Sequence, residues 1–439
     1  MHALHVTRLA SALALVFSSG AHSVNLSESY RDALAYDAQY ASARASYRAT
    51  QEKLPQARAG LLPNVSADAY VRRNDVKSSL PGGDARFTSD GVSATAAQPL
   101  FRPQNWVVYE QAKLQLHVGE SQLKLAEQDL ILRVARAYFD VLQAQDNIAF
   151  IQSQKAAISE QLASAKRNFE VGNATVTDTH EAQARFDLAT AQEIAAVNDR
   201  EIRLRTLQRL MGKSPLPLAA LGDKAAIPLP ATGSMDDWVN RAAEQNLQSR
   251  IQRDLKLIAD QEVARNRASA YPTLDAVASY SINNNQNFGS QQIDSKTAVI
   301  GLELAVPIYQ GGLSNSHVRE AVANQDKARF DLENANREAG LQASQAYLNA
   351  ANGQAQVKAL EQAHISTQAQ LDSTKLGLQV GVRTSLDVLN AQQQVLSAQR
   401  DLSAARYNFI MAGLNLQAAV GELDAADLAE VDRYLTAVR

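Results

Sequence analysis

Proline is confined to a few short stretches of this chain, and its absence elsewhere is the strongest constraint on the fold. All eleven prolines lie at positions 55, 63, 81, 99, 103, 215, 217, 228, 230, 272 and 307. Because a proline inside a helix costs about 3 kcal/mol, the two proline-free spans 104–214 and 308–439 can form very long helices. One helix over 104–170 would be about 100 Å long, which no compact domain requires.

Each proline-free span carries the marks of a helical hairpin. Apolar residues step by three and four through the first span, which is the spacing of a coiled-coil seam. They are Leu123, Ala126, Leu130, Val134, Ala137, Val141, Ala144, Ile148 and Ile151. A less regular seam in the second span passes through Leu341, Ala346, Leu348 and Leu360. Gly172 and Gly381 interrupt the spans, and Thr175 and Thr384 follow as suitable helix N-caps. A tight turn is therefore predicted at each tip, with a simple kink as the alternative.

The chain also repeats itself at an offset of 209 residues. The matching segments are 171–178 with 380–387, 182–183 with 391–392, 137–138 with 346–347, and 62–63 with 271–272. One spacing shared by several separate places indicates a duplication, in which both halves fold alike.

Four short segments alternate apolar and polar residues as half-buried strands do. They are residues 64–76, 92–97, 274–282 and 298–306, joined in pairs by polar loops at 77–90 and 283–295. Their length suits tilted membrane-spanning strands. Four strands cannot close a barrel, about eight being the minimum, and lipid does not tolerate open sheet edges. Several chains must therefore pool their strands: two copies would give a filled barrel, and three would leave room for a channel.

Composition narrows the class further. There is no cysteine, which excludes disulfides, thiolate metal sites and a lipidated N-terminal cysteine. The net charge of −3 gives no reason to expect nucleic acid as a partner. The seven histidines lack metal-ligand spacing and no catalytic or phosphate-binding motif is present, so no metal, no cofactor and no enzyme activity is expected. Residues 1–23 are typical of a secretory signal peptide, cleaved after Ala21 or Ser23, and no later stretch is long and apolar enough for a membrane helix.

Three segments, 270–275, 304–312 and 380–389, together resemble the TolC-type outer-membrane factors, and the likeness extends over the mature chain. The resemblance implies an α+β membrane protein of the cell outer membrane. It would be a homotrimer with a shared twelve-stranded β-barrel in outer-membrane lipid and a long α-helical coiled-coil tunnel through the periplasm. The chain is expected to divide into a signal peptide at 1–23, a first repeat at 24–214, a linker at 215–232, a second repeat at 233–420 and an equatorial segment at 421–439. In the first repeat the β-hairpin would span about 64–97 and the helical hairpin about 100–211. In the second repeat they would span about 273–306 and about 313–419.

The resemblance also implies a gate at the inner tip. The family's polar links between coiled coils fall here on Thr177, Asp178 and Arg383, whereas a third family position, a tyrosine, is Leu378. Of two family aspartates that form stacked acidic rings inside the tunnel, the first is Asp387. The second is replaced by Asn390, so weaker block by multivalent cations is expected. The alternative interpretation is that Asp178 and Asp387 are ordinary carboxylates near helix N-termini.

The resemblance further implies that the hairpin tips dock a periplasmic adaptor (membrane fusion protein). The tip residues are Val171, Gly172, Val380 and Gly381, and the alternative is a plain turn glycine in each tip.

Two functions compete within the family. One is the exit duct of type I secretion, which works with an inner-membrane ABC transporter and an adaptor to export a toxin-like protein. The other is the exit duct of a multidrug efflux pump with small-molecule cargo, and one duct can also serve both functions. The segment 309–312 and the missing lipidation cysteine favour secretion. A third hypothesis is that the chain is a periplasmic coiled-coil adaptor, and the four alternating segments disfavour it. In every reading a partner supplies the energy for transport.

Overall fold

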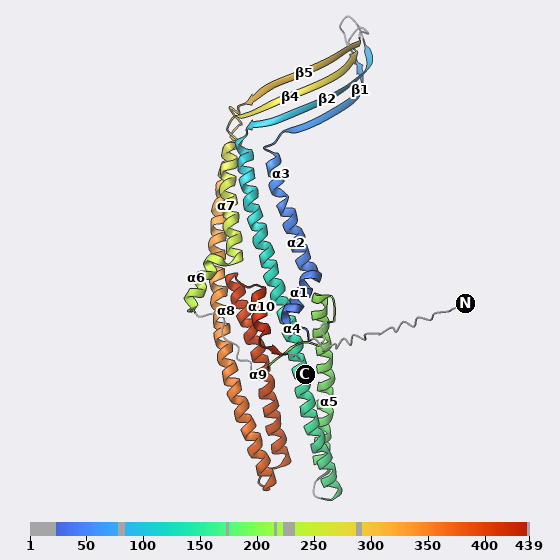
Figure 1. The fold of residues 1–439 in the computed structure, drawn as a ribbon, viewed down its shortest axis with the longest axis vertical. Helices are drawn as coiled ribbons and strands as arrows, with labels where there is room; N and C mark the ends of the chain where they lie inside the picture. Colours follow the sequence, from blue (N-terminus) through green and yellow to red (C-terminus); the bar gives the residue numbers. More distant parts are fainter. Residues whose placement is uncertain are drawn as a thin grey trace, which may run out of the picture.

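The computed structural model in Figure 1 describes residues 23–77, 84–172, 175–214, 217–222, 233–286 and 292–436. The predicted signal peptide lies outside these residues except for Ser23, and of the predicted linker only residues 217–222 are described. The subunit is elongated, with a sheet at one end, two helical tips at the other and a belt of short elements around its middle (Figure 1).

The first half runs from short helices through a strand pair into a long helical hairpin. Its elements are α1 (Leu26–Tyr36), α2 (Ala38–Gln51), α3 (Lys53–Ala59), β1 (Asn64–Val76), β2 (Ala85–Phe101), α4 (Pro103–Glu170) and α5 (Val176–Met211). Pro103 is the first residue of α4, where its missing N–H breaks no helical hydrogen bond, and the helix then continues for 68 residues. The uninterrupted helix predicted over 104–170 is therefore confirmed.

The second half follows the same order of elements. They are α6 (Met235–Gln245), α7 (Leu247–Ala268), β4 (Thr273–Gln286), β5 (Gln292–Ala305), α8 (Leu313–Gln379) and α9 (Ser385–Val420), followed by α10 (Ala425–Asp432) and β6 (Leu435–Thr436). The helix α8 has 67 residues, and α9 has 36, as α5 does. The two hairpins thus match in length, as a duplication requires. The two-residue strand β3 (Ala220–Leu221) pairs with β6 in the belt.

The four longer strands form one antiparallel sheet in the order β1-β2-β4-β5. The strand β1 matches the predicted segment 64–76. The other three are longer than predicted, because β2 begins at Ala85, and β4 and β5 extend into the predicted loop 283–295. The sequence prediction stopped where the apolar alternation stops, but backbone pairing continues. Polar cross-strand pairs support the extension, as when Arg86 Nε lies 3.0 Å from Asp75 Oδ2.

The sheet register sorts side chains by polarity. On β4 and β5 the even-numbered residues share one face, which includes Leu274, Tyr280, Ile300 and Leu302. The opposite face of the same strands is rich in polar and small residues. Ile300 is 90% exposed and Leu302 is 68% exposed within one subunit. An apolar face of this kind is unfavourable in water and suited to lipid.

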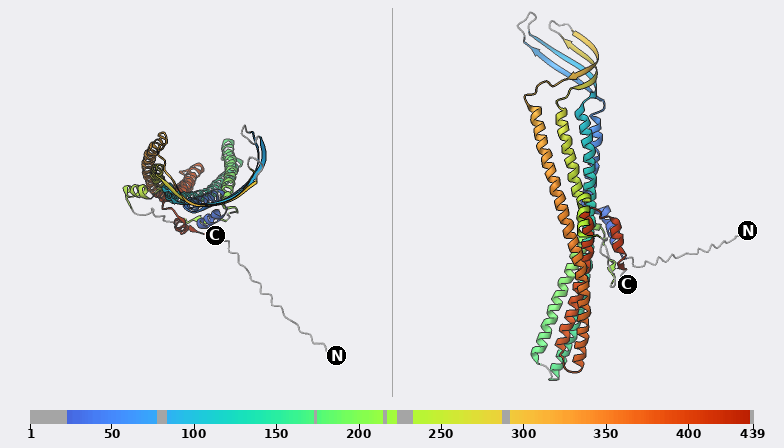
Figure 2. Two further views of the ribbon diagram at one scale, coloured as in Figure 1. Left: turned by 90° about the horizontal axis from the view of Figure 1, so that it is seen from above. Right: turned by 90° about the vertical axis from the view of Figure 1, so that its left-hand side faces the viewer.

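The largest hydrophobic core lies in the belt, where α1, α4, α5, α9 and α10 meet. Leu130, Val134 and Val141 of the first predicted seam are fully buried there. Tyr138 is also buried, and its hydroxyl donates to the carbonyl of Ala219 at 2.7 Å. Seen from above, the helices and the sheet form a curved wall, and α1 and α10 lie on its convex side (Figure 2).

Two of the four residues predicted for the seam of the second hairpin are exposed, whereas Ala346 packs against the Trp238 cluster and Leu360 is half-buried. Leu341 and Leu348 are 52% and 50% exposed, whereas Ala339, Ala343 and Ala350 are buried. Ala343 and Ala350 pack in a cluster with Trp238 of α6. The small alanine side chains let the bulky indole of Trp238 approach α8. The face of α8 that is buried is therefore the face that contacts α6, and it is not the face that carries the largest apolar residues.

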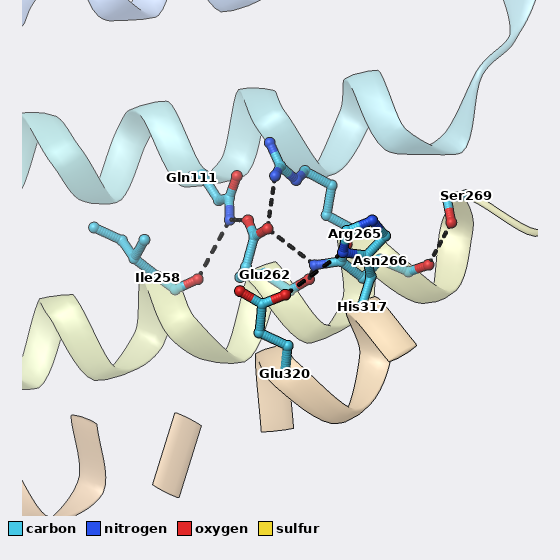
Figure 3. A network of polar contacts seen from close by, with 8 residues as sticks. All are labelled: Gln111, Ile258, Glu262, Arg265, Asn266, Ser269, His317 and Glu320. Carbon is cyan, nitrogen blue, oxygen red and sulfur yellow. Dashed lines mark hydrogen bonds and ion pairs between the residues drawn. The ribbon is translucent and has the colours of Figure 1, made fainter. Parts of the chain in front are cut away.

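A polar network joins α7 to α4 (Figure 3). The Gln111 side chain of α4 donates to Glu262 Oε2 at 3.0 Å and to the Ile258 carbonyl at 3.3 Å. Glu262 Oε1 also accepts from Arg265 at 2.6 Å. These bonds fix α7 beside the upper part of α4. Within the described ranges, no helix is both long and apolar enough to cross a bilayer.

Candidate gate at the hairpin tips

Each long helix ends at a glycine that adopts a left-handed conformation. Gly172 has φ of 79° and Gly381 has φ of 80°, and a β-carbon at either position would meet nothing within 4 Å. The reason for glycine here is therefore the backbone conformation and not a close contact. Val171 and Val380, which precede the glycines, are 68% and 66% exposed. The predicted docking residues thus stand on the surface of the two tips.

The helix that leaves each tip starts with a capping box. Thr175 Oγ1 accepts from the N–H of Asp178 at 3.2 Å, while Asp178 Oδ2 accepts from Thr175 N at 2.8 Å and from its hydroxyl at 2.9 Å. Thr384 and Asp387 repeat this arrangement at 3.2, 2.9 and 2.9 Å. The N-cap role predicted for both threonines is confirmed. The aspartates themselves close the boxes, which is the alternative interpretation of these two residues.

These hydrogen bonds favour the ionised carboxylates. The Thr384 N–H and hydroxyl, together with the nearby charge of Arg383, lower the pKa of Asp387 below its ordinary value. The Thr175 N–H and hydroxyl lower the pKa of Asp178 in the same way. Each tip therefore carries a fixed negative charge at neutral pH.

Arg383 lies against its own helix end. The N–H groups of Val382 and Arg383 both donate to the carbonyl of Gly377, at 2.9 and 3.2 Å. A β-carbon at Gly377 would lie 2.7 Å from Arg383 Cγ, so the arginine stem covers this glycine. Within the described part of one subunit, no hydrogen bond or ion pair joins Arg383 to Asp178. Thr177 is exposed on the other hairpin. The residues of the predicted latch are thus not brought together inside one chain.

The two positions that depart from the family pattern are both accessible. Asn390 lies one helical turn after Asp387 and is exposed, and Leu378 in the last turn of α8 is 38% exposed. Next to Asn390 the two hairpins touch, because Leu389 of α9 packs with Ile158 of α4 and Ala189 of α5. Sequence reasoning missed this contact, since no repeat or motif marks Leu389.

The fold is that of known outer-membrane channels. The structure of the Campylobacter jejuni CmeC outer membrane channel superimposes with a TM-score of 0.79 over 99% of this chain and 97% of that chain, at 16% sequence identity. The chain therefore has the fold of that class of channel subunit, a four-stranded sheet carried on long helical hairpins. The predicted fold class is confirmed.

Sequence comparison gives the family. The outer membrane efflux protein family matches residues 29–213 and 241–422. The chain is similar to the outer membrane protein TolC of Vibrio cholerae, with 34% identity over 97% of both chains. It is also similar to the alkaline protease secretion protein AprF of Pseudomonas aeruginosa, with 32% identity over 96% of this chain and 90% of that one. The chain belongs to the outer membrane efflux protein family, and it is a subunit of an exit duct in the outer membrane.

The capping boxes predict how the tips respond to Asp387→Asn. Loss of the carboxylate weakens the cap of α9, so amide hydrogens in the first turn of α9 should exchange severalfold faster at neutral pH. The intact Thr175–Asp178 box in the same molecule is the matched control, and its amides should not change. Equal exchange at residues 385–389 in variant and parent would contradict the role of Asp387 as a cap.

The same boxes predict a dependence on pH. A carboxyl with a lowered pKa in the folded state stabilises the fold fully above its unfolded pKa of about 3.9. That stabilisation is lost as pH falls through the lower, folded pKa. Acidification from about pH 5 to about pH 3 should therefore loosen both tips of the parent protein but only the first tip of Asp387→Asn, measured by exchange corrected for its intrinsic rate.

Proposed function

We propose that three copies of this chain assemble into one passive channel that serves type I protein secretion. The observation that carries the assembly is the open sheet. In the described residues β1 pairs only with β2, and β5 pairs only with β4, so both outer edges lack partners. Lipid cannot satisfy unpaired backbone groups. Joining β1 of one copy to β5 of the next removes every edge, and three copies give twelve strands around a water-filled bore.

The polarity of the sheet supports this arrangement. The even-numbered apolar face of β4 and β5 would meet outer-membrane lipid, and the face with Asp275, Ser279 and Ser281 would line the bore. The helical hairpins would continue the bore through the periplasm. Two homologous repeats, 24–214 and 233–420, would then contribute equally to the wall, with 215–232 and 421–439 in the belt.

The likeness to AprF favours a secretion system, because the name of that relative describes alkaline protease secretion. The partners would be a periplasmic adaptor, docked at Val171-Gly172 and Val380-Gly381, and an inner-membrane ABC transporter. The relatives are channels, and we infer that this chain likewise has no enzyme activity and draws its energy from the transporter. The alternative is a multidrug efflux duct, which the description of the family favours.

The gate would close between hairpins of different chains. Arg383 of one subunit would reach Asp178 and Thr177 of a neighbour, where a charge-assisted bond between exposed groups can form and break readily. Leu378 offers no hydrogen bond to this latch. Three Asp387 carboxylates would form one acidic ring, and Asn390 would leave the second ring uncharged.

The proposed secretion function and the efflux alternative predict different phenotypes when the gene is deleted in its native host. Large proteins should disappear from the culture medium while sensitivity to hydrophobic drugs stays unchanged, and the reverse result would establish the efflux alternative. Complementation with Val171→Glu plus Val380→Glu should fail, because charge is placed on the docking tips. Ile365→Glu, at a similarly exposed position on α8, is the control and should restore secretion.

The shared sheet predicts disulfide links between subunits. The chain has no cysteine of its own, so Val71→Cys can be combined in turn with Ala298→Cys, Ile300→Cys or Leu302→Cys. At least one pair should yield covalent trimers on denaturing gels. The control pair Ala94→Cys and Tyr280→Cys joins neighbouring strands of one sheet and should give monomers only. Monomers from every β1–β5 pair would refute the pooled barrel.

The single acidic ring predicts the response of the open channel to multivalent cations. In planar bilayers, Asp387→Ala should weaken block by a trivalent cation. Asn390→Asp should strengthen it by about fivefold, the scale of an added charge interaction across water. Unchanged block in both variants would remove these positions from the bore.

A further inference from the structure

A stripe of amide side chains runs along the middle of α8. Its members are Gln342, Gln345, Asn349, Asn352 and Gln356, and all are exposed. Their spacing of three, four, three and four residues places them on one face of the helix. Residues 342–356 contain no Asp, Glu, Lys or Arg, and Gln342 at the start of the stripe donates to Glu338, one turn earlier, at 3.0 Å.

The stripe is one wall of a groove of about 650 Å³. Residues of α4, α9 and the junction of α6 with α7 complete the lining. Ten of the twenty described lining residues are Asn or Gln, one is Arg136, and none is acidic. The groove therefore combines many neutral hydrogen-bonding groups with a single positive charge.

Arg136 forms no ion pair in the described part of the chain; Asp140, one turn later on α4, pairs with Arg203 at 3.3 Å. Arg133, one turn earlier on α4, lies 2.9 Å from Asp37 and 2.7 Å from Asp129. Arg136 is exposed, and in the described part of the chain it makes no ion pair or hydrogen bond. Its guanidinium donors are free for a ligand.

The groove opens on the concave side of the wall. Ile410 and Leu414 of α9 pack into the core that contains α1 and α10. Asn408 and Asn415, which line the groove, lie on a different side of the same helix. Because α1 and α10 lie on the convex side (Figure 2), the groove faces away from them, towards the bore of the proposed trimer.

We propose that this amide groove is a carboxylate-binding station for cargo on its way through the duct. The guanidinium of Arg136 would bind acidic side chains through bidentate hydrogen bonds. The amide side chains would donate hydrogen bonds to the cargo backbone and accept them from it. No described lining residue is a carboxylate; the acidic side chain that contacts the lining is Glu338, which accepts from Gln342 at 3.0 Å at one end of the stripe. The inference rests on the proposed trimeric duct, in which three copies of Arg136 surround one bore.

The test is current block in planar bilayers with the full-length channel. Polyglutamate is added on the sheet side, and glutarate is added in a second arm at the same carboxylate concentration. Loss of one charged contact per subunit in Arg136→Gln should raise the half-blocking concentration of polyglutamate by about tenfold or more. Arg136→Lys should retain much of the block because the charge remains. Arg31→Gln, an exposed arginine of α1 on the convex side, should behave as the parent channel.

Each outcome decides the proposal. Block by polyglutamate that depends on Arg136 supports it, whether or not glutarate also blocks. Block by glutarate alone assigns the groove to small anions and overturns a role with polypeptide cargo. Equal block of the parent and Arg136→Gln overturns the station while the channel itself stands. Absence of any conducting channel would instead refute the proposed duct, and the station with it.

Discussion

Everything in this subunit depends on a sheet whose backbone is unsatisfied at both edges. Among the described residues, β1 and β5 each pair on one side only, and the apolar face of the sheet is exposed in the single chain. In water the exposed apolar face is unfavourable, and in lipid the unpaired backbone groups of the sheet edges are unfavourable. Only a closed assembly in a membrane satisfies both demands. The long helices are consistent with that solution, because a wall shared between copies does not need a large core of its own.

Stability within the chain is concentrated away from both functional ends. The belt buries Tyr138, Leu130 and their neighbours, whereas the tips rest on turn glycines and capping boxes. This distribution suits the proposed gate, in which the tips would open while the middle stays fixed. The charges differ along the length as well: carboxylates stand at the tips, and the amide groove higher up carries only Arg136.

The sequence predicted most of the secondary structure because the deciding signals were local. Missing prolines predicted α4, Gly172 and Gly381 predicted the tips, and alternation predicted the strands. The strand ends were missed because backbone pairing continues beyond the apolar residues, as at Arg86 and Asp75. Leu341 and Leu348 were wrongly placed in the second seam because burial on α8 depends on where Trp238 of another helix packs. The amide stripe has a regular spacing, but only burial and a neighbouring groove give that spacing a meaning.

The sequence alone determined that the chain has two matching halves, very long helices, and too few strands to close a barrel. These follow from proline, glycine and periodicity, which act through the local backbone. Tertiary structure decided the rest. It set Arg383 and Asp178 on different hairpins with no bond between them in the described part of one chain, and it brought Arg136 to a groove whose described lining holds no carboxylate. Those facts depend on distances between segments far apart in sequence, and no local pattern specifies such distances.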